Sequence, residues 1–151
     1  IWYLEKITAK SADSITLSTW EVKDMKTCCT VLYEGWQMQC CGQPFRIGDM
    51  VRWDVFAFNE TITDIPQTIE YIYDAHYETS DGLLTLQGIV HQINAIYTKY
   101  KASTDNPQLL VPVSSLLKSL VKADGNEEEV NGMTFDSYIV VLGDVSIKRG
   151  W

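Results

Sequence analysis

The sequence predicts a mainly β fold: a small antiparallel β-barrel or strongly bent sheet of about eight strands, with at most one short helix. Three observations support this prediction. Apolar and polar side chains alternate with the period of a strand, turn signals recur at short spacing, and a glycine interrupts the longest apolar run. The chain of 151 residues has the length of one domain, so residues 1–151 are expected to form one barrel-like unit.

Four strands are predicted in the first half of the chain. Residues 2–9 and 15–20 flank a polar loop whose composition suits a hairpin. Residues 28–33 form a short β-branched and aromatic run. Residues 50–58 alternate between apolar and polar side chains directly after a Gly-Asp turn.

A long bent hairpin is predicted over residues 69–97. Residues 69–78 alternate between apolar and polar side chains, and the turn signal Ser-Asp-Gly follows at residues 80–82. The second strand of this hairpin is apolar on both faces and contains Gly88. A glycine inside a strand often marks a bulge or sharp bend, so we expect the strand to curl at Gly88.

The C-terminal third combines a predicted helix with a predicted hairpin. Residues 113–121 carry apolar side chains at the spacing of an amphipathic helix, although a short strand leading to the Asp-Gly turn at 124–125 is the alternative. Residues 126–132 are expected to form a solvated loop. Residues 137–142 and 145–148 are predicted strands, with Gly143 and Asp144 as the tight turn between them.

The charge balance argues against a nucleic-acid-binding protein. The chain has 12 Lys and Arg against 20 Asp and Glu, a formal net charge of -8. Proteins that bind nucleic acids gain much of their affinity by neutralising phosphates, so nucleic acid is not an expected partner. Seven carboxylates fall between Asp54 and Asp81, and no Lys or Arg occurs between Trp53 and Thr98. This acidic stretch is interpreted as a solvated face, with a cation site or a basic partner as the alternative.

Targeting signals are also missing from the sequence. No apolar stretch approaches the length of a membrane span, and the N-terminal residues lack the pattern of a secretory signal. We therefore expect a protein that does not enter a membrane.

The connection at residues 36–45 is the candidate site, because it is unusually apolar for a loop. The residues predicted to bind are Trp36, Gln37, Met38, Cys40, Cys41 and Phe45. Two interpretations remain open. The large apolar side chains plug one end of the barrel, or they form the wall of a site for a ligand or partner.

The four cysteines form two adjacent pairs, Cys28 with Cys29 and Cys40 with Cys41, and are expected to be reduced thiols. Adjacent residues of a strand point to opposite faces, so Cys28 and Cys29 can hardly share a metal ion. The alternative function is a thiol-dependent enzyme or zinc protein that uses Cys40 or Cys41 with His76 or His91. No ligand spacing in the sequence favours zinc, and no cofactor is predicted.

The stretch WQMQCCGQPF at residues 36–45, followed by GDMVRW at residues 48–53, resembles the opening motif of a family of small bacterial proteins classed as a domain of unknown function. Residues 88–93 and 138–142 are similar to that family's second and last strands. Cys40 and Cys41 belong to the motif, whereas Cys28 and Cys29 do not. The resemblance implies a bacterial, cytoplasmic protein, and it implies no activity.

Together these observations predict a non-catalytic binding or interaction module that presents residues 36–45. The expected partner is another protein, a small-molecule ligand or a second copy of the chain. This prediction depends on the apolar loop, because the sequence contains no recognisable catalytic motif.

Overall fold

The structure is a computed structural model that describes residues 26–62, 65–74 and 83–149. The strands predicted at residues 2–9 and 15–20 and the turn predicted at residues 80–82 lie outside the described residues. Among the described residues, no helix has the length and apolar character needed to cross a membrane.

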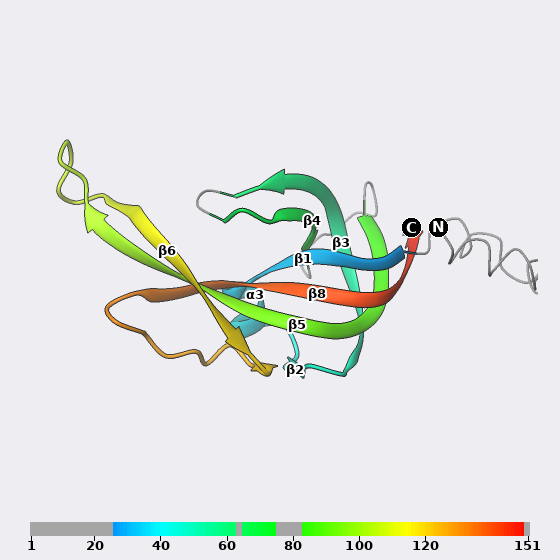
Figure 1. The fold of residues 1–151 in the computed structure, drawn as a ribbon. Helices are drawn as coiled ribbons and strands as arrows, with labels where there is room; N and C mark the ends of the chain where they lie inside the picture. Colours follow the sequence, from blue (N-terminus) through cyan, green and yellow to red (C-terminus); the bar gives the residue numbers. More distant parts are fainter. Residues whose placement is uncertain (1–25, 63–64, 75–82, 150–151) are drawn as a thin grey trace, which may run out of the picture.

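The described residues form eight strands and one short helix, which confirms the prediction of a mainly β fold (Figure 1). In chain order the elements are β1 (Lys26–Glu34), α3 (Gly35–Cys40), β2 (Phe45–Arg46), β3 (Met50–Thr61), β4 (Thr68–Tyr73), β5 (Leu83–Ala102), β6 (Leu110–Leu120), β7 (Lys122–Ala123) and β8 (Thr134–Arg149). The strands β1, β3 and β8 include the segments predicted as strands at residues 28–33, 50–58 and 137–142.

Six strands form one sheet in the order β3-β4-β1-β8-β5-β6, and β2 pairs with β7. Because β3 also pairs with β5, the first five strands of that order are linked in a ring, with β6 added outside it. Among the pairings of the described strands, β1 with β4 is parallel and the others are antiparallel. The parallel pair departs from the wholly antiparallel sheet that the sequence predicted.

The long strand β5 connects the parts of the fold and curves strongly (Figure 1). Its first part pairs with β3 and its second part with β6, while β8 lies along its other side. Gly88 lies where the register between β5 and β8 shifts, and a Cβ there would come within 2.9 Å of the Gly143 carbonyl oxygen. The predicted role of Gly88 at a bend is therefore confirmed: the two backbones approach too closely for a side chain.

The helix predicted over residues 113–121 is wrong, because this segment is most of strand β6. It pairs with β5 from the Ile93–Leu120 pair to the Ala102–Leu110 pair. Leu116 and Leu120 pack on one apolar cluster and Leu117 on another. A spacing of four residues keeps two side chains on the same face of a strand as well as of a helix, so the pattern fits both. The segment forms a strand rather than a helix because it pairs along its length with the long strand β5.

Two predicted hairpins are also wrong. β4 does not pair with β5, because β3 and β1 occupy its two edges. The predicted turn at Gly143 and Asp144 lies inside the continuous strand β8. Asp144 has a φ of 50°, which produces a local irregularity rather than a reversal of the chain. The local turn signal at Gly143 and Asp144 therefore indicated an irregularity in the strand, but it did not predict which strands pair.

Two apolar clusters form because β1, β5 and β8 are apolar on both faces. The larger cluster contains residues from all five strands of the ring, among them Val31, Val55, Tyr71, Leu86 and Val140. The smaller one consists of Leu32, Ile65, Ile69, Ile96 and Ile139. Successive residues of a strand point to opposite faces. Because Leu32 follows Val31 and Ile139 precedes Val140, the smaller cluster lies on the outer face of the ring.

Candidate functional site

Half of the sequence-predicted site is part of the core. Gln37, Met38 and Phe45 are 2%, 4% and 4% exposed, and Met38 and Phe45 belong to the larger apolar cluster. The Gln37 side-chain amide donates a hydrogen bond of 3.1 Å to the backbone carbonyl of Tyr73. These contacts agree with the interpretation that this segment plugs one end of the fold.

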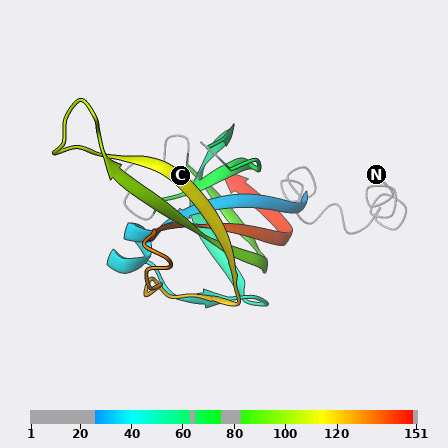
Figure 2. The same cartoon turned by 60° about the vertical axis from the view of Figure 1, so that its left-hand side comes forward.

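A hydrogen-bond network fixes α3 to the segment before β8, and the two lie side by side in Figure 2. The Gln39 side-chain amide donates to the Gly125 carbonyl at 3.0 Å, and the Gly125 N–H donates to the Tyr138 hydroxyl at 2.8 Å. That hydroxyl in turn donates to a Glu127 carboxylate oxygen at 2.6 Å. Burial and the Glu127 carboxylate raise the pKa of Tyr138. The predicted solvated loop at residues 126–132 therefore has one anchored carboxylate.

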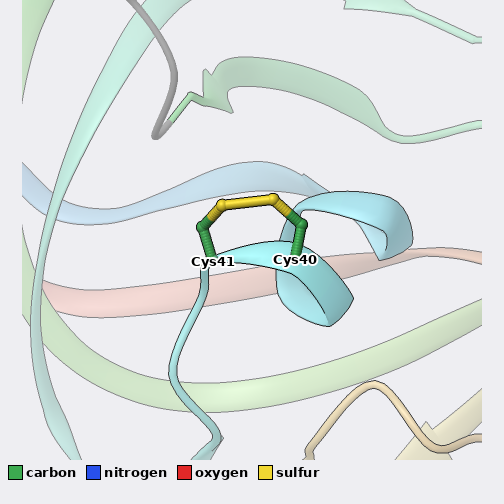
Figure 3. The surroundings of a disulfide bond; sticks show 2 residues. All are labelled: Cys40 and Cys41. Atoms are coloured by element: carbon green, nitrogen blue, oxygen red, sulfur yellow. A yellow bond between two sulfur atoms is a disulfide. The ribbon is translucent and has the colours of Figure 1, made fainter.

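The other predicted site residues are exposed. Trp36 is 53% exposed, and Cys40 and Cys41 are exposed and joined to each other by a disulfide. Figure 3 shows Cys40 at the end of α3 and Cys41 at the start of the segment leading to β2. The expectation of reduced thiols is thus wrong for this pair. Cys28 is exposed and Cys29 is buried, as expected for neighbours in a strand.

We expect alanine substitutions in α3 to separate its buried side from its exposed side. Met38→Ala should lower the free energy of unfolding by about 2–5 kcal/mol, because it leaves a cavity in the core. Trp36→Ala should change it by less than about 0.5 kcal/mol, because the indole is largely exposed. Urea denaturation of the two variants measures both values. Equal losses would contradict the assignment of Trp36 to the surface.

The predicted partners of the cysteines are not assembled at α3. The ring of His91 lies against Gly143, so close that a Cβ on Gly143 would collide with the ring. Gly143 pairs with Cys28, which lies near the start of β1. Cys40 and Cys41 follow the other end of β1, and the rise per residue of a strand places that end roughly 20 Å from Cys28. His76 lies outside the described residues. Within the described ranges, no three His, Cys, Asp or Glu residues are grouped so that they could hold a metal ion.

A groove that the sequence did not predict lies on the outer face of the ring. Its volume is about 310 Å³, and its lining residues come from β1, β8, β5 and β6 and from the described residues that follow β3. The lining residues are Leu32, Glu34, Ile62, Ile65, Ile96, Thr98, Tyr100, Pro112, Ser115, Asp136 and Ser137.

The floor of the groove is apolar and tightly packed. Leu32 and Ile96 belong to the outer apolar cluster, in which Leu32 lies opposite Ile139 across the β1–β8 pairing. On one side Ile65, which is 4% exposed, packs on this floor. On the other side Pro112 of β6 contributes to the wall. The groove thus has a base of strands, one wall from β6 and another from Ile62 and Ile65, which follow β3.

Two carboxylates line the groove near α3. Glu34 is half-buried and lies opposite Ser137 across the β1–β8 pairing. Ile96 lies opposite Ser137, but the next residue of β5 lies opposite Phe135, so β8 has one extra residue here. That residue is Asp136, which a β-bulge aims into the groove together with its neighbour.

The carboxylates of the groove have no cationic partner in the described part of the chain, where neither Glu34 nor Asp136 forms an ion pair. Asp136 is exposed, but the surrounding protein removes enough water to raise the pKa of its carboxyl. The groove therefore combines an apolar floor with unneutralised negative charge.

One sequence signal could have indicated the groove. The apolar run from Ile139 to Leu142 is continuous, which is typical of a strand covered on both faces. It implies an apolar outer face on β8, although it does not show what lies over that face.

Comparisons with known proteins give a family but no activity. A family model described as a family of unknown function (DUF6578) matches residues 27–144. No curated protein and no solved structure matches the chain.

Proposed function

We propose that this chain, which belongs to the DUF6578 family of unknown function, is a non-catalytic binding module whose ligand site is the outer groove. The observation that carries the proposal is the groove itself. Its volume of about 310 Å³ falls within the range of small-molecule sites, roughly 300–1,000 Å³. Like such sites, it combines apolar walls with a few polar groups placed at one side.

The ring of five strands is proposed to be a closed barrel, and its connectivity supports a binding role by analogy of fold. Around the ring the neighbouring strands are β5, β8, β1, β4 and β3, and β3 pairs with β5. With β5, β8 and β1 counted as the first three strands, this matches a circularly permuted oligonucleotide- or oligosaccharide-binding barrel. Such barrels bind ligands on the face of their second and third strands, between two loops. In this chain that face is formed by β8 and β1, and the groove lies there.

The ligand is not expected to be a nucleic acid. Barrels that bind single strands use a positively charged groove with aromatic platforms. Here the described lining residues include two carboxylates and no lysine or arginine. The net charge of -8 opposes phosphate binding as well.

A non-catalytic role is favoured over a thiol enzyme. The described residues that line the groove are apolar, hydroxyl-bearing or acidic, and they include no cysteine or histidine. The alternative pairing of Cys40 or Cys41 with His91 requires residues that lie near opposite ends of β1. The disulfide also occupies the sulfurs of both Cys40 and Cys41.

The exposed side of α3 is a second candidate contact surface, as the sequence suggested. Trp36 is 53% exposed, and large aromatic side chains are common in protein interfaces. It follows Glu34 of the groove by two residues, so a protein partner bound there would lie beside the groove. A bacterial source, a cytoplasmic location and self-association stay predictions from the sequence.

A tryptophan that fills the groove is expected to prevent binding. Ser115 lines the groove from β6, whereas Ser114 is exposed and absent from the lining. With 4-phenylbutanol as a neutral probe, Ser115→Trp should weaken binding to the full chain by tenfold or more, about 1.4 kcal/mol. Saturation-transfer NMR of the probe gives the dissociation constants.

Ser114→Trp is the matched control, because it adds the same side chain one residue away on the other face of β6. This variant should bind the probe like the unmodified chain. Equal binding by both variants, or no saturable binding by the unmodified chain, would contradict a ligand site in the groove.

A further inference from the structure

We infer that the ligand of the groove is a small organic cation: an ammonium or guanidinium group on an apolar body. This inference rests on the proposed function, because it assigns a ligand class to the same groove. Three features carry it: the position of the two carboxylates, the apolar floor beside them, and the size of the groove.

The carboxylates are placed by the backbone on adjacent strands. Glu34 ends β1, and Asp136 is the extra residue of the bulge in β8, next to the residue that pairs with Glu34. Side chains of neighbouring strands at this separation can contact one charged group together. A β-bulge at this point is what brings Asp136 to the groove, since regular alternation would turn it to the other face.

The carboxylates of Glu34 and Asp136 favour a positively charged group on the ligand. An ammonium or guanidinium group donates charge-assisted hydrogen bonds to carboxylates and neutralises their negative charge. Within residues 26–62, 65–74 and 83–149, neither carboxylate forms an ion pair with a lysine or arginine. The sequence reinforces this, since it has no Lys or Arg between Trp53 and Thr98.

The rest of the groove favours an apolar body on that cation. Leu32 and Ile96 form the floor, Ile62 and Ile65 one wall, and Tyr100 is part of the lining. A bare metal ion would leave these surfaces unused, and the described residues offer no third ligand group for one. A volume of about 310 Å³ holds a small molecule.

The overall charge acts in the same direction. With a formal net charge of -8, the chain attracts cations from solution and repels anions. The acidic stretch after Trp53, interpreted from the sequence as a solvated face, adds to this field.

A matched set of three probes tests the ligand class on the full chain. The probes 4-phenylbutylamine, 4-phenylbutanol and 4-phenylbutyrate share one apolar body and carry a positive, neutral or negative head group. We expect the amine to bind about tenfold more tightly than the alcohol at neutral pH, and the acid to bind most weakly. Saturation-transfer NMR at low salt measures all three dissociation constants.

Isosteric variants test whether the two carboxylates cause the preference. Glu34→Gln and Asp136→Asn should each reduce the advantage of the amine several-fold and leave the affinity for the alcohol unchanged. Glu60→Gln, which removes an exposed carboxylate of β3 outside the lining, should keep the full preference.

The outcomes separate this inference from the proposed function. If the alcohol binds in the groove and the amine binds no better, the cation assignment is wrong while the groove remains a ligand site. If the acid binds best, the assignment is also wrong. If no probe binds, the inference and the proposed function fail together.

Discussion

Tyr33→Ala is expected to lower the free energy of unfolding by about 3–5 kcal/mol, among the largest effects of any single substitution in this chain. Tyr33 is 1% exposed and lies at the centre of an aromatic cluster. Its ring stacks on Tyr73 with centroids 4.0 Å apart and meets Trp53 edge to face at 5.2 Å. Truncation would leave a cavity bordered by rigid strands, which cannot collapse to fill it. Urea denaturation followed by tryptophan fluorescence measures the loss.

Tyr100→Ala is the control for this prediction, because the Tyr100 side chain is 42% exposed. It should change the free energy of unfolding by less than about 0.5 kcal/mol. A small loss for Tyr33→Ala would show that the aromatic cluster does not form the core of the fold.

Gly88→Val is expected to lower the free energy of unfolding by about 2–3 kcal/mol through overpacking. A Cβ at Gly88 would lie 2.9 Å from the Gly143 carbonyl oxygen and 3.3 Å from a Val145 methyl group. The first contact is with backbone, so a side-chain rotation cannot relieve it. Gly88 pairs with Val51 of β3, and β8 lies on the other side of β5. The substitution therefore strains the ring where β3, β5 and β8 meet.

Gln87→Val is the matched control, because it introduces the same valine side chain one position earlier in β5. Gln87 is exposed, so valine there should be accepted within about 0.5 kcal/mol. Urea denaturation of Gly88→Val and Gln87→Val measures both free energies of unfolding. Equal stability of the two variants would contradict the close approach of β5 and β8 at Gly88.

The strand segments could be predicted from the sequence, but their partners could not. Alternation in the segments that became β3 and β4 reports which residues face the core, because side-chain direction is a local property. Pairing depends on distant residues: β4 lies beside β1 in parallel, although the Asp-Gly signal suggested a hairpin with β5. Likewise, the helical spacing in β6 was a local pattern that a long partner strand overrode.

For a related reason the groove was not predicted from the sequence, and none of the six residues predicted to bind lines it. The apolar segment after β1 was predicted to bind a partner or ligand, and burial divides it into core residues such as Met38 and exposed ones such as Trp36. The groove joins residues from β1, β5, β6 and β8, so no single segment carries its signature. Its two carboxylates are ordinary in the sequence, and only the bulge at Asp136 brings them together.

The groove and the exposed side of α3 are two candidate binding surfaces, and they lie at different positions on the fold. Residues of β1, β5 and β8 report on the groove, whereas residues 36–45 report on α3. A probe that binds one surface leaves the amide signals of the other largely unchanged.

The most direct test is a protein-observed NMR titration of the 15N-labelled chain with 4-phenylbutylamine. We predict saturable shifts of the backbone amides of Leu32, Glu34, Thr98 and Ser137, with the amides of residues 36–45 shifting far less. The largest shifts at Trp36 or in the segment around the disulfide, or the lack of any saturable shift, would contradict the assignment of the groove as the binding site.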